Sequence, residues 1–427
     1  MINIKKLRES PDVVRAALAR RDPAIDGILE QMLRLDESRR ELLANVERLK
    51  ADRNRSSEEV ARLKKEKADA SELLLVLRDL SHTIKELDQK VRSVEGELDS
   101  LALQVPNLPL AELPDGGAED YRVVRSWGEP TSFDFDARPH WELGETLGLL
   151  DLPRGAKIAG SGFPLFVGTG ARLVRSLVNM MLDVHVREHG YLEIAPPLLV
   201  NEDSARGTGQ LPDLEDNMYV TKDGLYLVPT AEVPVTNFHR NDVLAADILP
   251  RAFVAHTPCF RREAGAHGAD TRGIIRVHQF DKVELVRMCR PENSPSELEL
   301  LLGHAEKILQ MLELPYRVIQ LAAGDIGFSS AMTYDIEVWA AGVGKWLEVS
   351  SVSTFTDFQA RRANIRYKPD PKAKPDFVHT LNGSALALPR TIIPLLENNQ
   401  RPDGSVELPA ALASYVGDTM LKPHGDA

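Results

Sequence analysis

The sequence predicts an α+β protein in which an N-terminal antiparallel coiled-coil hairpin precedes a larger domain of mixed strands and helices. Two observations support this prediction: an apolar repeat that averages about 3.5 residues over residues 27–101, and alternating strand-like and helix-like stretches from residue 127 onward. Prolines and glycines gather between the two regions, in residues 106–117, as they do in linkers. We therefore expect one domain over residues 1–105 and a second over residues 106–427.

Two series of regularly spaced positions define the predicted hairpin. Steps of four and three residues from Ile28 to Leu63 meet eight apolar side chains at eleven positions, and steps of three and four from Ala70 to Leu101 meet ten at ten. Such a repeat keeps one seam turned toward a partner helix. The register changes at residues 66–70, where we expect the helices to fold back on each other. Roughly 38 residues at about 1.5 Å each would make an arm of roughly 60 Å.

The second domain is predicted to hold strands and helices of ordinary length. Its composition favours strands over Tyr191–Ile194, Leu225–Pro229, Arg251–Arg261, Ile274–Val286, Ala331–Val338 and Trp346–Thr354. Helical periodicity is found instead in Ala171–His189 and Ser296–Leu312, and the apolar run Ile392–Leu396 favours a further helix.

Composition excludes several classes of protein. Of the 427 residues, 43% are apolar and 27% charged, as in an ordinary globular protein, and the net charge of −12 argues against a protein that coats nucleic acid. Only Cys259 and Cys289 are present, so we expect no disulfide framework. No apolar run approaches the roughly 20 residues of a membrane helix, and charged residues precede any apolar core at the N-terminus. We therefore expect a soluble, cytoplasmic protein.

Three segments of the second domain carry polar residues suited to a nucleotide triphosphate with magnesium. Cys259–Gly265 leads through a polar stretch to Gly273–Glu284, which indicates a strand, a long loop and a second strand, with an arginine and a glutamate closing the first strand. Glu348–Ser351 forms the second segment, and Leu381–Thr391, which runs into the helix over Ile392–Leu396, forms the third. Together they supply carboxylates, hydroxyls and two isolated arginines.

These segments resemble the signature of the seryl-tRNA synthetases, which are class II aminoacyl-tRNA synthetases. Glu193–Pro197 resembles the end of motif one, Phe260–Glu284 motif two and Leu381–Leu396 motif three, while Thr230-Ala231-Glu232 resembles the family's serine-binding loop. The resemblance extends from the hairpin to about Pro409. It implies a homodimer whose catalytic domain is built on an antiparallel sheet flanked by helices.

The resemblance also implies roles for individual residues in activating serine with ATP. Arg261 would bind the α-phosphate, Glu263 the adenine amino group, and Arg390 would stack on adenine and reach the γ-phosphate. Glu348 and Ser351 would bind Mg²⁺, a hard cation that prefers oxygen. The implied catalytic residues are Arg261, Glu348 and Arg390, and the implied ATP-binding residues are Arg261, Arg262, Glu263, Val277, Glu348, Val349, Ser350, Ser351 and Arg390.

Serine recognition would fall, by the same resemblance, to Thr230, Ala231, Glu232, Arg261, Glu284, Asn382 and Ser384. One of the carboxylates Glu232 and Glu284 would bind the serine ammonium and the other the hydroxyl group, and the sequence leaves their order open. A site built for a hydroxyl rejects alanine strongly, because its polar groups would be left unpaired.

The hairpin resembles the family's tRNA-binding arm, which grips the long variable arm of tRNA-Ser and, by analogy, tRNA-Sec. The residues implied to contact tRNA are Arg48, Arg53, Arg55, Arg62 and Lys64. Basic side chains are useful against phosphates only if they share a face of the arm. Taken alone, the heptads would favour a dimerisation or scaffolding coiled coil, and the synthetase-like body reverses that preference.

Two alternatives to a tRNA ligase follow from other classes of protein. The first is a ligase that makes seryl-adenylate and loads serine onto an acceptor other than tRNA, or serves a resistance pathway. The second is a non-catalytic structural coiled-coil protein. We expect no zinc, because the pairs His256 with Cys259 and His185 with His189 have no further ligands near them in the sequence.

The sequence departs from the family pattern at five positions outside the residues implied to bind ATP, magnesium or serine. These are Ala269, Met332, Thr354, Ala385 and Pro389. Proline before Arg390 fixes φ and removes a backbone N–H at the predicted helix start. The departures favour the hypothesis of a divergent, specialised copy, for example one that tolerates an inhibitor.

Overall fold

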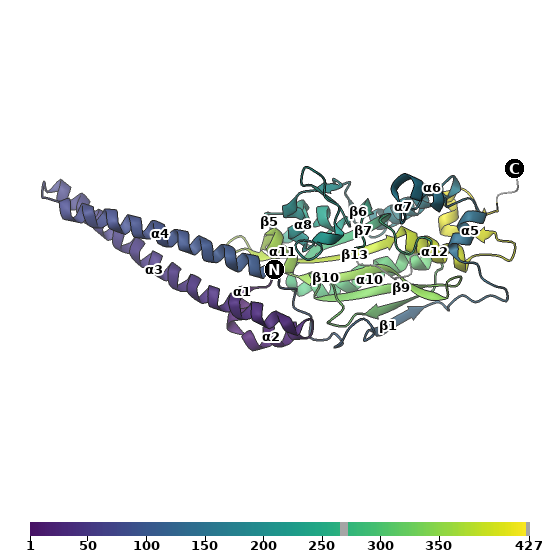
Figure 1. The fold of residues 1–427 in the computed structure, drawn as a ribbon, viewed down its shortest axis with the longest axis horizontal. Coiled ribbons are helices and arrows are strands. Elements are labelled where there is room, and N and C mark those ends of the chain that lie inside the picture. Colours follow the sequence, from purple (N-terminus) through teal and green to yellow (C-terminus); the bar gives the residue numbers. More distant parts are fainter. Residues whose placement is uncertain (265–271, 424–427) are drawn as a thin grey trace. The chain divides into compact units, whose positions relative to one another are not determined.

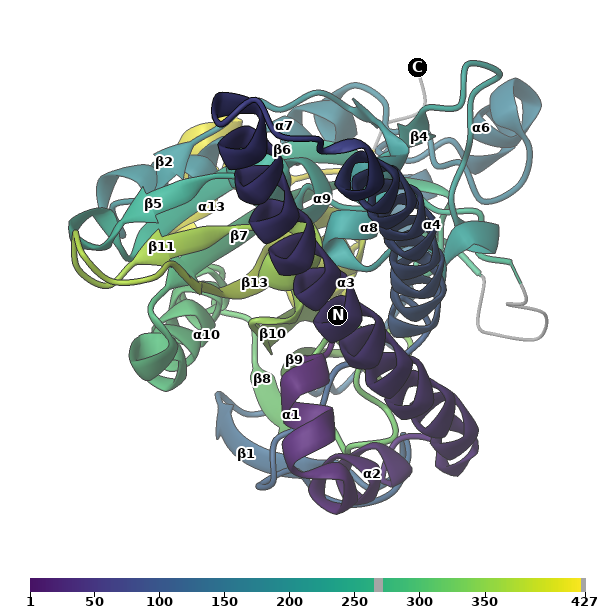
Figure 2. The same ribbon diagram turned by 90° about the vertical axis from the view of Figure 1, so that its left-hand side faces the viewer.

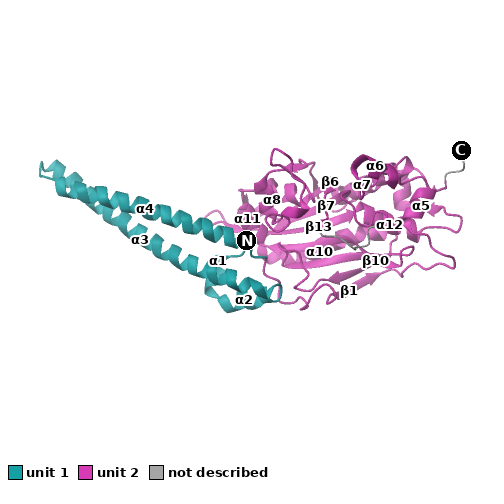
Figure 3. Ribbon diagram, viewed as in Figure 1, with its two compact units in different colours: residues 1–106 teal, residues 107–427 magenta. Residues whose placement is uncertain are grey.

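The computed structural model describes residues 1–264 and 272–423, and Ala269 therefore lies outside the described residues. The chain divides into two compact units, residues 1–106 and 107–427 (Figure 3). The first unit is helical and the second is built on a sheet, so the predicted α+β fold with an N-terminal helical hairpin is confirmed. Among the described residues, no helix is long and apolar enough to cross a membrane.

The first unit consists of two short helices and a long helical hairpin. After α1 (Ile4–Glu9) and α2 (Pro11–Ala19), α3 covers Asp26–Lys65 and α4 covers Ser71–Ala102, and the two long helices run side by side (Figure 1). Every position of the two apolar series is buried or half-buried. At about 1.5 Å per residue, the 40 residues of α3 span roughly 60 Å, as predicted.

One buried carboxylate in this unit was not apparent from the apolar pattern. Asp36 on α3 is 1% exposed and accepts hydrogen bonds from Arg8 at 2.9 Å, Arg39 at 2.8 Å and Arg40 at 3.2 Å. Although burial opposes its charge, the hydrogen bonds from Arg8 and Arg39 hold the pKa of Asp36 below its ordinary value. This cluster ties α1 to the base of the hairpin.

The second unit is organised around one eight-stranded sheet. Its strand order, seen from one edge to the other in Figure 2, is β1 (Arg122–Trp127), β8 (Tyr316–Gln320), β9 (Met332–Ala340), β10 (Lys345–Thr356), β13 (His379–Ala387), β7 (Gln279–Cys289), β6 (Arg251–Phe260) and β2 (Leu192–Glu193). Neighbouring strands are antiparallel except β2 and β6, which are parallel. The antiparallel sheet implied by the family resemblance is thus confirmed.

Helices cover this sheet on both faces. On one face, α7 (Thr169–Arg187), α10 (Ser294–Met311) and α12 (Leu388–Asn398) share an apolar core with odd-numbered residues of β7 such as Val283 and Leu285. On the other face, α9 (Glu232–Thr236) and α11 (Phe358–Ala363) pack on even-numbered residues. Because successive side chains of a strand point to opposite faces, Lys282 and Glu284 belong to the α9 and α11 face.

Shorter elements complete the second unit. They are four short helices and three smaller sheets. The strand orders of these sheets are β12-β11-β5, β14-β15 and β3-β4. Their bounds are α5 (His140–Thr146), α6 (Leu152–Ala159), α8 (Glu202–Thr208), α13 (Ala410–Val416), β3 (Leu199–Val200), β4 (Tyr226–Leu227), β5 (Val243–Ala245), β11 (Arg366–Lys368), β12 (Asp376–Phe377), β14 (Val406–Glu407) and β15 (Met420–Leu421).

The strand predicted over Ile274–Val286 was wrong in its first part, because β7 begins only at Gln279. The backbone before it bonds to partners outside the strand ladder: Ile274 N–H donates to a histidine ring, and His278 N–H donates to the carbonyl of Gly162. The sequence reading also missed β1, β8 and β13. In β13, the polar residues that face the site broke the apolar pattern expected of a central strand.

Candidate active site

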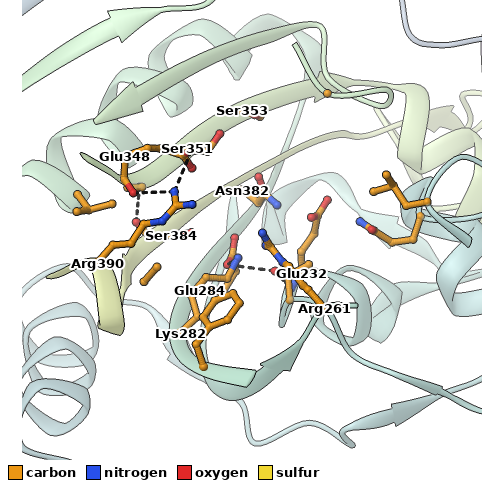
Figure 4. A pocket seen from close by; sticks show the side chains of 18 of the residues that line it. Glu232, Arg261, Lys282, Glu284, Glu348, Ser351, Ser353, Asn382, Ser384 and Arg390 are labelled. Carbon is orange, nitrogen blue, oxygen red and sulfur yellow. Dashed lines mark hydrogen bonds and ion pairs between the residues drawn. The ribbon is translucent and has the colours of Figure 1, made fainter. Parts of the chain in front are cut away.

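A cavity of about 260 Å³ in the second unit brings together most of the residues implied by the family resemblance (Figure 4). Of those residues, the ones that line it are Thr230, Glu232, Arg261, Glu263, Val277, Glu284, Glu348, Val349, Ser350, Ser351, Asn382, Ser384 and Arg390. Ala231 and Arg262 do not: Ala231 is buried in the core beneath α9, and Arg262 is exposed.

The strand register explains why these side chains converge. Glu284 of β7 lies opposite Ser384 of β13, and the polar residues Asn382 and Ser384 alternate with Leu381 and buried apolar neighbours. A register shift follows Ser384, and a second one falls between Glu348 and Ser350 of β10. Bulges of this kind re-aim side chains beside a site. Three neighbouring strands therefore present carboxylates, hydroxyls and an amide to one cavity.

One end of the cavity holds two buried carboxylates and a lysine. The Thr230 hydroxyl donates to Glu284 at 3.2 Å, and Lys282 forms an ion pair with the same carboxylate. Glu232 is 7% exposed and accepts a hydrogen bond from Gln359 at 2.6 Å. Burial, with a smaller contribution from the negative charge of Glu284, raises the pKa of Glu232 to about 7.

Away from these carboxylates, the cavity is lined by the ion pairs Arg390–Glu348 and Arg276–Glu263, whereas Arg261 lies beside Glu232 (Figure 4). Arg390 Nη1 lies 3.2 Å from Glu348 Oε2, and Arg390 Nε donates to the carbonyl of Ile275 at 3.1 Å. Arg276 pairs with Glu263 at 2.9 Å. Arg261 Nε donates to the carbonyl of Pro229 at 3.3 Å, and its guanidinium lies 5.2 Å from the centroid of the Phe280 ring.

A third carboxylate lies behind Glu348 and Ser351. Asp335 of β9 lies opposite Ser351 of β10 in the strand register. Burial first, and then the charge of Glu348, raise the pKa of Asp335 well above its ordinary value. Among the described residues, no three His, Cys, Asp or Glu side chains are placed to hold a metal ion. A carboxylate and a hydroxyl fit Mg²⁺ only if a bound triphosphate supplies the remaining oxygens.

Several residues of the site escaped the sequence analysis. Lys282 stands two positions before Glu284 on the same strand, so the two-residue period of a strand could have placed it in the cavity. No spacing or motif in the sequence points to His140 and Glu397. His140 Nδ1 lies 2.8 Å from Glu397 Oε1, and Ile274 N–H donates to His140 Nε2 at 3.1 Å, with both side chains fully buried. This pair fixes the segment of motif two that walls the cavity.

Comparison with known proteins places the chain in a family. The family model of the seryl-tRNA synthetase N-terminal domain matches residues 1–109, and that of the class II tRNA synthetase core domain (G, H, P, S and T) matches residues 217–399. A serine–tRNA ligase from Gemmatimonas aurantiaca is 53% identical over 424 residues, which cover 99% of this chain and 100% of the relative. The chain belongs to the seryl-tRNA synthetase family.

Solved structures agree with the assignment of the chain to this family. The seryl-tRNA synthetase from Pyrococcus horikoshii complexed with ATP superimposes with a TM-score of 0.94 at 36% identity, covering 100% of both chains. The M. kandleri SerRS, solved in complex with A. aeolicus tRNASec, has a TM-score of 0.59 at 18% identity, covering 81% of this chain and 71% of that one, and therefore shares the fold alone.

The departures from the family pattern fall in different parts of this synthetase. Met332 and Thr354 line a separate cavity of about 270 Å³, where the Thr354 hydroxyl lies 3.2 Å from the Ser294 hydroxyl. Pro389 lines the main cavity at the start of α12, where a missing N–H is tolerated. Ala385 is a fully buried residue of β13 that belongs to the main apolar core. The hypothesis of a specialised copy stays a prediction.

The residues implied to contact tRNA all lie in the second half of α3. Arg48, Arg55 and Arg62 are exposed and stand seven residues apart, which places them on one face of the helix. We call these three residues the arm face. Arg53 is half-buried and Lys64 is exposed. Each member of the arm face is hydrogen bonded to an acceptor on its own helix, Asn45, Asp52 and Glu59.

Proposed function

We propose that this synthetase activates L-serine with ATP and transfers it to tRNA-Ser and, by family analogy, to tRNA-Sec. The observation that carries the proposal is the composition of the cavity: two buried carboxylates beside a threonine hydroxyl and Arg261 at one end, and Arg390 with a carboxylate and a serine hydroxyl at the other (Figure 4). The first set suits an amino acid with a hydroxyl group, and the second suits a triphosphate.

In the activation step, a carboxylate oxygen of serine attacks the α-phosphorus of ATP and pyrophosphate leaves. Negative charge must be neutralised where the two anions approach each other. Arg261 lies beside Glu232 in the cavity (Figure 4), and we assign it to the α-phosphate. Glu263 accepts from the adenine amino group, and Arg390 stacks on adenine and reaches the γ-phosphate. Arg261, Glu348 and Arg390 are the proposed catalytic residues.

Magnesium fits the nucleotide end of the cavity. Glu348, whose side chain is 47% exposed, and Ser351 would hold the ion together with phosphate oxygens of ATP. When bound, Mg²⁺ neutralises charge on the triphosphate. Arg390, which pairs with Glu348 in the structure, is then available for the nucleotide.

Serine recognition depends on the opposite end. Glu232 and Glu284 supply two carboxylates for one ammonium and one hydroxyl, while Thr230, Asn382 and Ser384 supply the remaining polar contacts. Alanine would leave one of these buried groups without its partner, which costs about 1–3 kcal/mol per group. Selection against alanine is therefore built into the serine end of the cavity.

The transfer step needs no basic side chain from the protein. Among the described residues, no histidine lines the cavity. The phosphate of seryl-adenylate can accept the proton of the attacking tRNA ribose hydroxyl, so that the seryl ester forms and AMP leaves. The protein's task in this step is to hold the adenylate and the tRNA end together.

We assign tRNA binding to residues 1–105 and catalysis to residues 106–427. The arm face offers three cations on one side of α3, where they could contact phosphates together. The active form is proposed to be a homodimer that acts in the cytoplasm, where tRNA and ATP are available. A non-tRNA acceptor is disfavoured, because a small acceptor gives a roughly 60 Å arm nothing to hold.

Two assays on one preparation test the proposal. Serine-dependent exchange between ATP and pyrophosphate measures adenylate formation, and charging of purified tRNA-Ser measures transfer. We expect both activities in the full chain. Deleting residues 48–72 should reduce charging while leaving exchange intact. Exchange without any charging by the full chain would favour the non-tRNA acceptor instead.

A further inference from the structure

A buried glutamine behind the serine end of the cavity has no assigned role. Gln359 lies on α11, is fully buried and does not line the cavity itself. Its Nε2 donates to Glu232 Oε1 at 2.6 Å and to the carbonyl of Thr208 at 3.1 Å. Its Oε1 accepts from the Thr380 hydroxyl at 2.8 Å. The amide therefore has one orientation that satisfies all three partners.

This arrangement constrains the carboxylate of Glu232. One of its oxygens is held by Gln359 from behind, so the rotation of the carboxyl group is fixed and the other oxygen is left for the cavity side, where Asn382 also lies. Thr380 and Thr208 hold Gln359 in turn, and both are fully buried. A hydrogen bond from a neutral amide stabilises the ionised form of a buried carboxylate.

We propose that Gln359 is a positioning residue for serine recognition, which orients Glu232 and keeps it in the ionised form that binds the polar groups of serine. The inference rests on the proposed serine site. It extends that site by one residue that touches neither serine nor ATP.

The groups around Glu232 set its pKa, so the pH dependence of serine binding should report on the hydrogen bond from Gln359. From β7 it faces Glu284, which opposes its ionisation, and Lys282, which favours it; from β13 it faces Asn382, and from α11 it faces Gln359. Burial and the charge of Glu284 raise the pKa of Glu232 to about 7, while the hydrogen bond from Gln359 lowers it. The ionised form therefore gains population as the pH rises through neutrality, and serine binding should strengthen from pH 6 to pH 8.

Replacing Gln359 should move this profile. Gln359→Met keeps the volume but removes the donor, so the pKa of Glu232 rises further and half-maximal serine binding shifts to higher pH. Loss of a hydrogen bond to a charged group predicts a rise in the serine KM of roughly 10- to 100-fold at pH 7. The ATP KM should change less than about twofold, because Gln359 is not among the cavity residues.

The experiment measures serine-dependent ATP–pyrophosphate exchange at several pH values with the full chain. Gln320→Met is the matched control, because Gln320 is also buried and hydrogen bonded, to Arg122, but lies outside the cavity. Gln359→Glu is the second variant: it keeps the acceptor for Thr380 and places another carboxyl group against Glu232. It should shift the pH profile further than Gln359→Met, and it carries the test if Gln359→Met does not fold.

Four outcomes are informative. A serine KM that rises alone, with the pH profile displaced upward, supports the proposal. Equal increases in both KM values without a displaced profile would show that Gln359 only stabilises the fold, and the proposal would be overturned. Glu232→Gln separates the two levels of the argument: if this variant binds serine normally, the proposed serine site fails, whereas a defect in Glu232→Gln without one in Gln359→Met refutes the inference alone.

Discussion

Lys282 provides the sharpest test of the charge arrangement in the cavity. It is 6% exposed and forms an ion pair with Glu284, which is 1% exposed, and Glu232 lies in the same end of the cavity. Lys282→Met keeps an unbranched side chain of similar length but removes the cation. The variant then has two buried carboxylates, and Glu284 lacks its lysine partner.

The magnitude of the effect follows from two routes open to the variant. Leaving a buried charge without its partner costs about 3–5 kcal/mol. Protonating a carboxyl group of ordinary pKa, about 4.3, costs about 3.7 kcal/mol at pH 7 and about 1.6 kcal/mol at pH 5.5, since each pH unit is worth about 1.36 kcal/mol. The cheaper route decides, so the variant should lose about 3–4 kcal/mol of unfolding free energy at pH 7 and less than half of that at pH 5.5.

Denaturant unfolding at the two pH values measures this difference. Lys222→Met, at an exposed position, is the matched control and should change stability by less than about 0.5 kcal/mol at either pH. Serine should stabilise the Lys282→Met variant, because its ammonium group can take the place of the missing lysine. A destabilisation that is equal at pH 7 and pH 5.5 would contradict the reasoning, because it would mean that packing rather than charge is lost.

Three further predictions follow from the same geometry. Arg261→Ala should reduce serine-dependent pyrophosphate exchange by at least about 100-fold with an unchanged melting temperature, and retained exchange would refute its phosphate role. Replacing the arm face with glutamines should raise the KM for tRNA and leave exchange unaffected. The slope of log KM against log salt concentration should also fall by up to about three, because each lost phosphate contact lowers it by about one. His140→Leu should raise the ATP KM more than the serine KM and lower the melting temperature. Ile274 N–H loses its acceptor, and Glu397 loses the imidazole while it keeps its backbone donors. Equal shifts of the two KM values would exclude a specific role.

The parts of the structure that the sequence predicted are those whose signals are local. The hairpin follows from a repeat in which each turn of helix is specified by residues three or four positions away. The cavity segments follow from short motifs in which the functional residues are neighbours in the chain. Their meeting in space required the family resemblance, because antiparallel strands can pair in many orders.

What the sequence could not give are contacts between distant segments. Gln359 meets Glu232 across 127 residues, and His140 meets Glu397 across 257. Each of these side chains is unremarkable in its own segment, and no period or spacing connects it to its partner. The predicted start of β7 was wrong for the same reason, because Ile274 N–H donates to His140 rather than to a neighbouring strand.

The two ends of the cavity differ in how firmly their charges are held, and this difference suits the two substrates. The side chains of Arg390 and Glu348 are 28% and 47% exposed, and those of Arg276 and Glu263 are 37% and 21% exposed. Ion pairs exposed to this degree are worth about 1 kcal/mol or less, so the proposed binding of ATP and magnesium here would displace them at little cost. The Lys282–Glu284 pair at the proposed serine end is almost completely buried, and Glu284 also accepts a hydrogen bond from Thr230. If the proposed roles hold, discrimination between amino acids rests on fixed groups, while the nucleotide end exchanges its partners during each catalytic cycle.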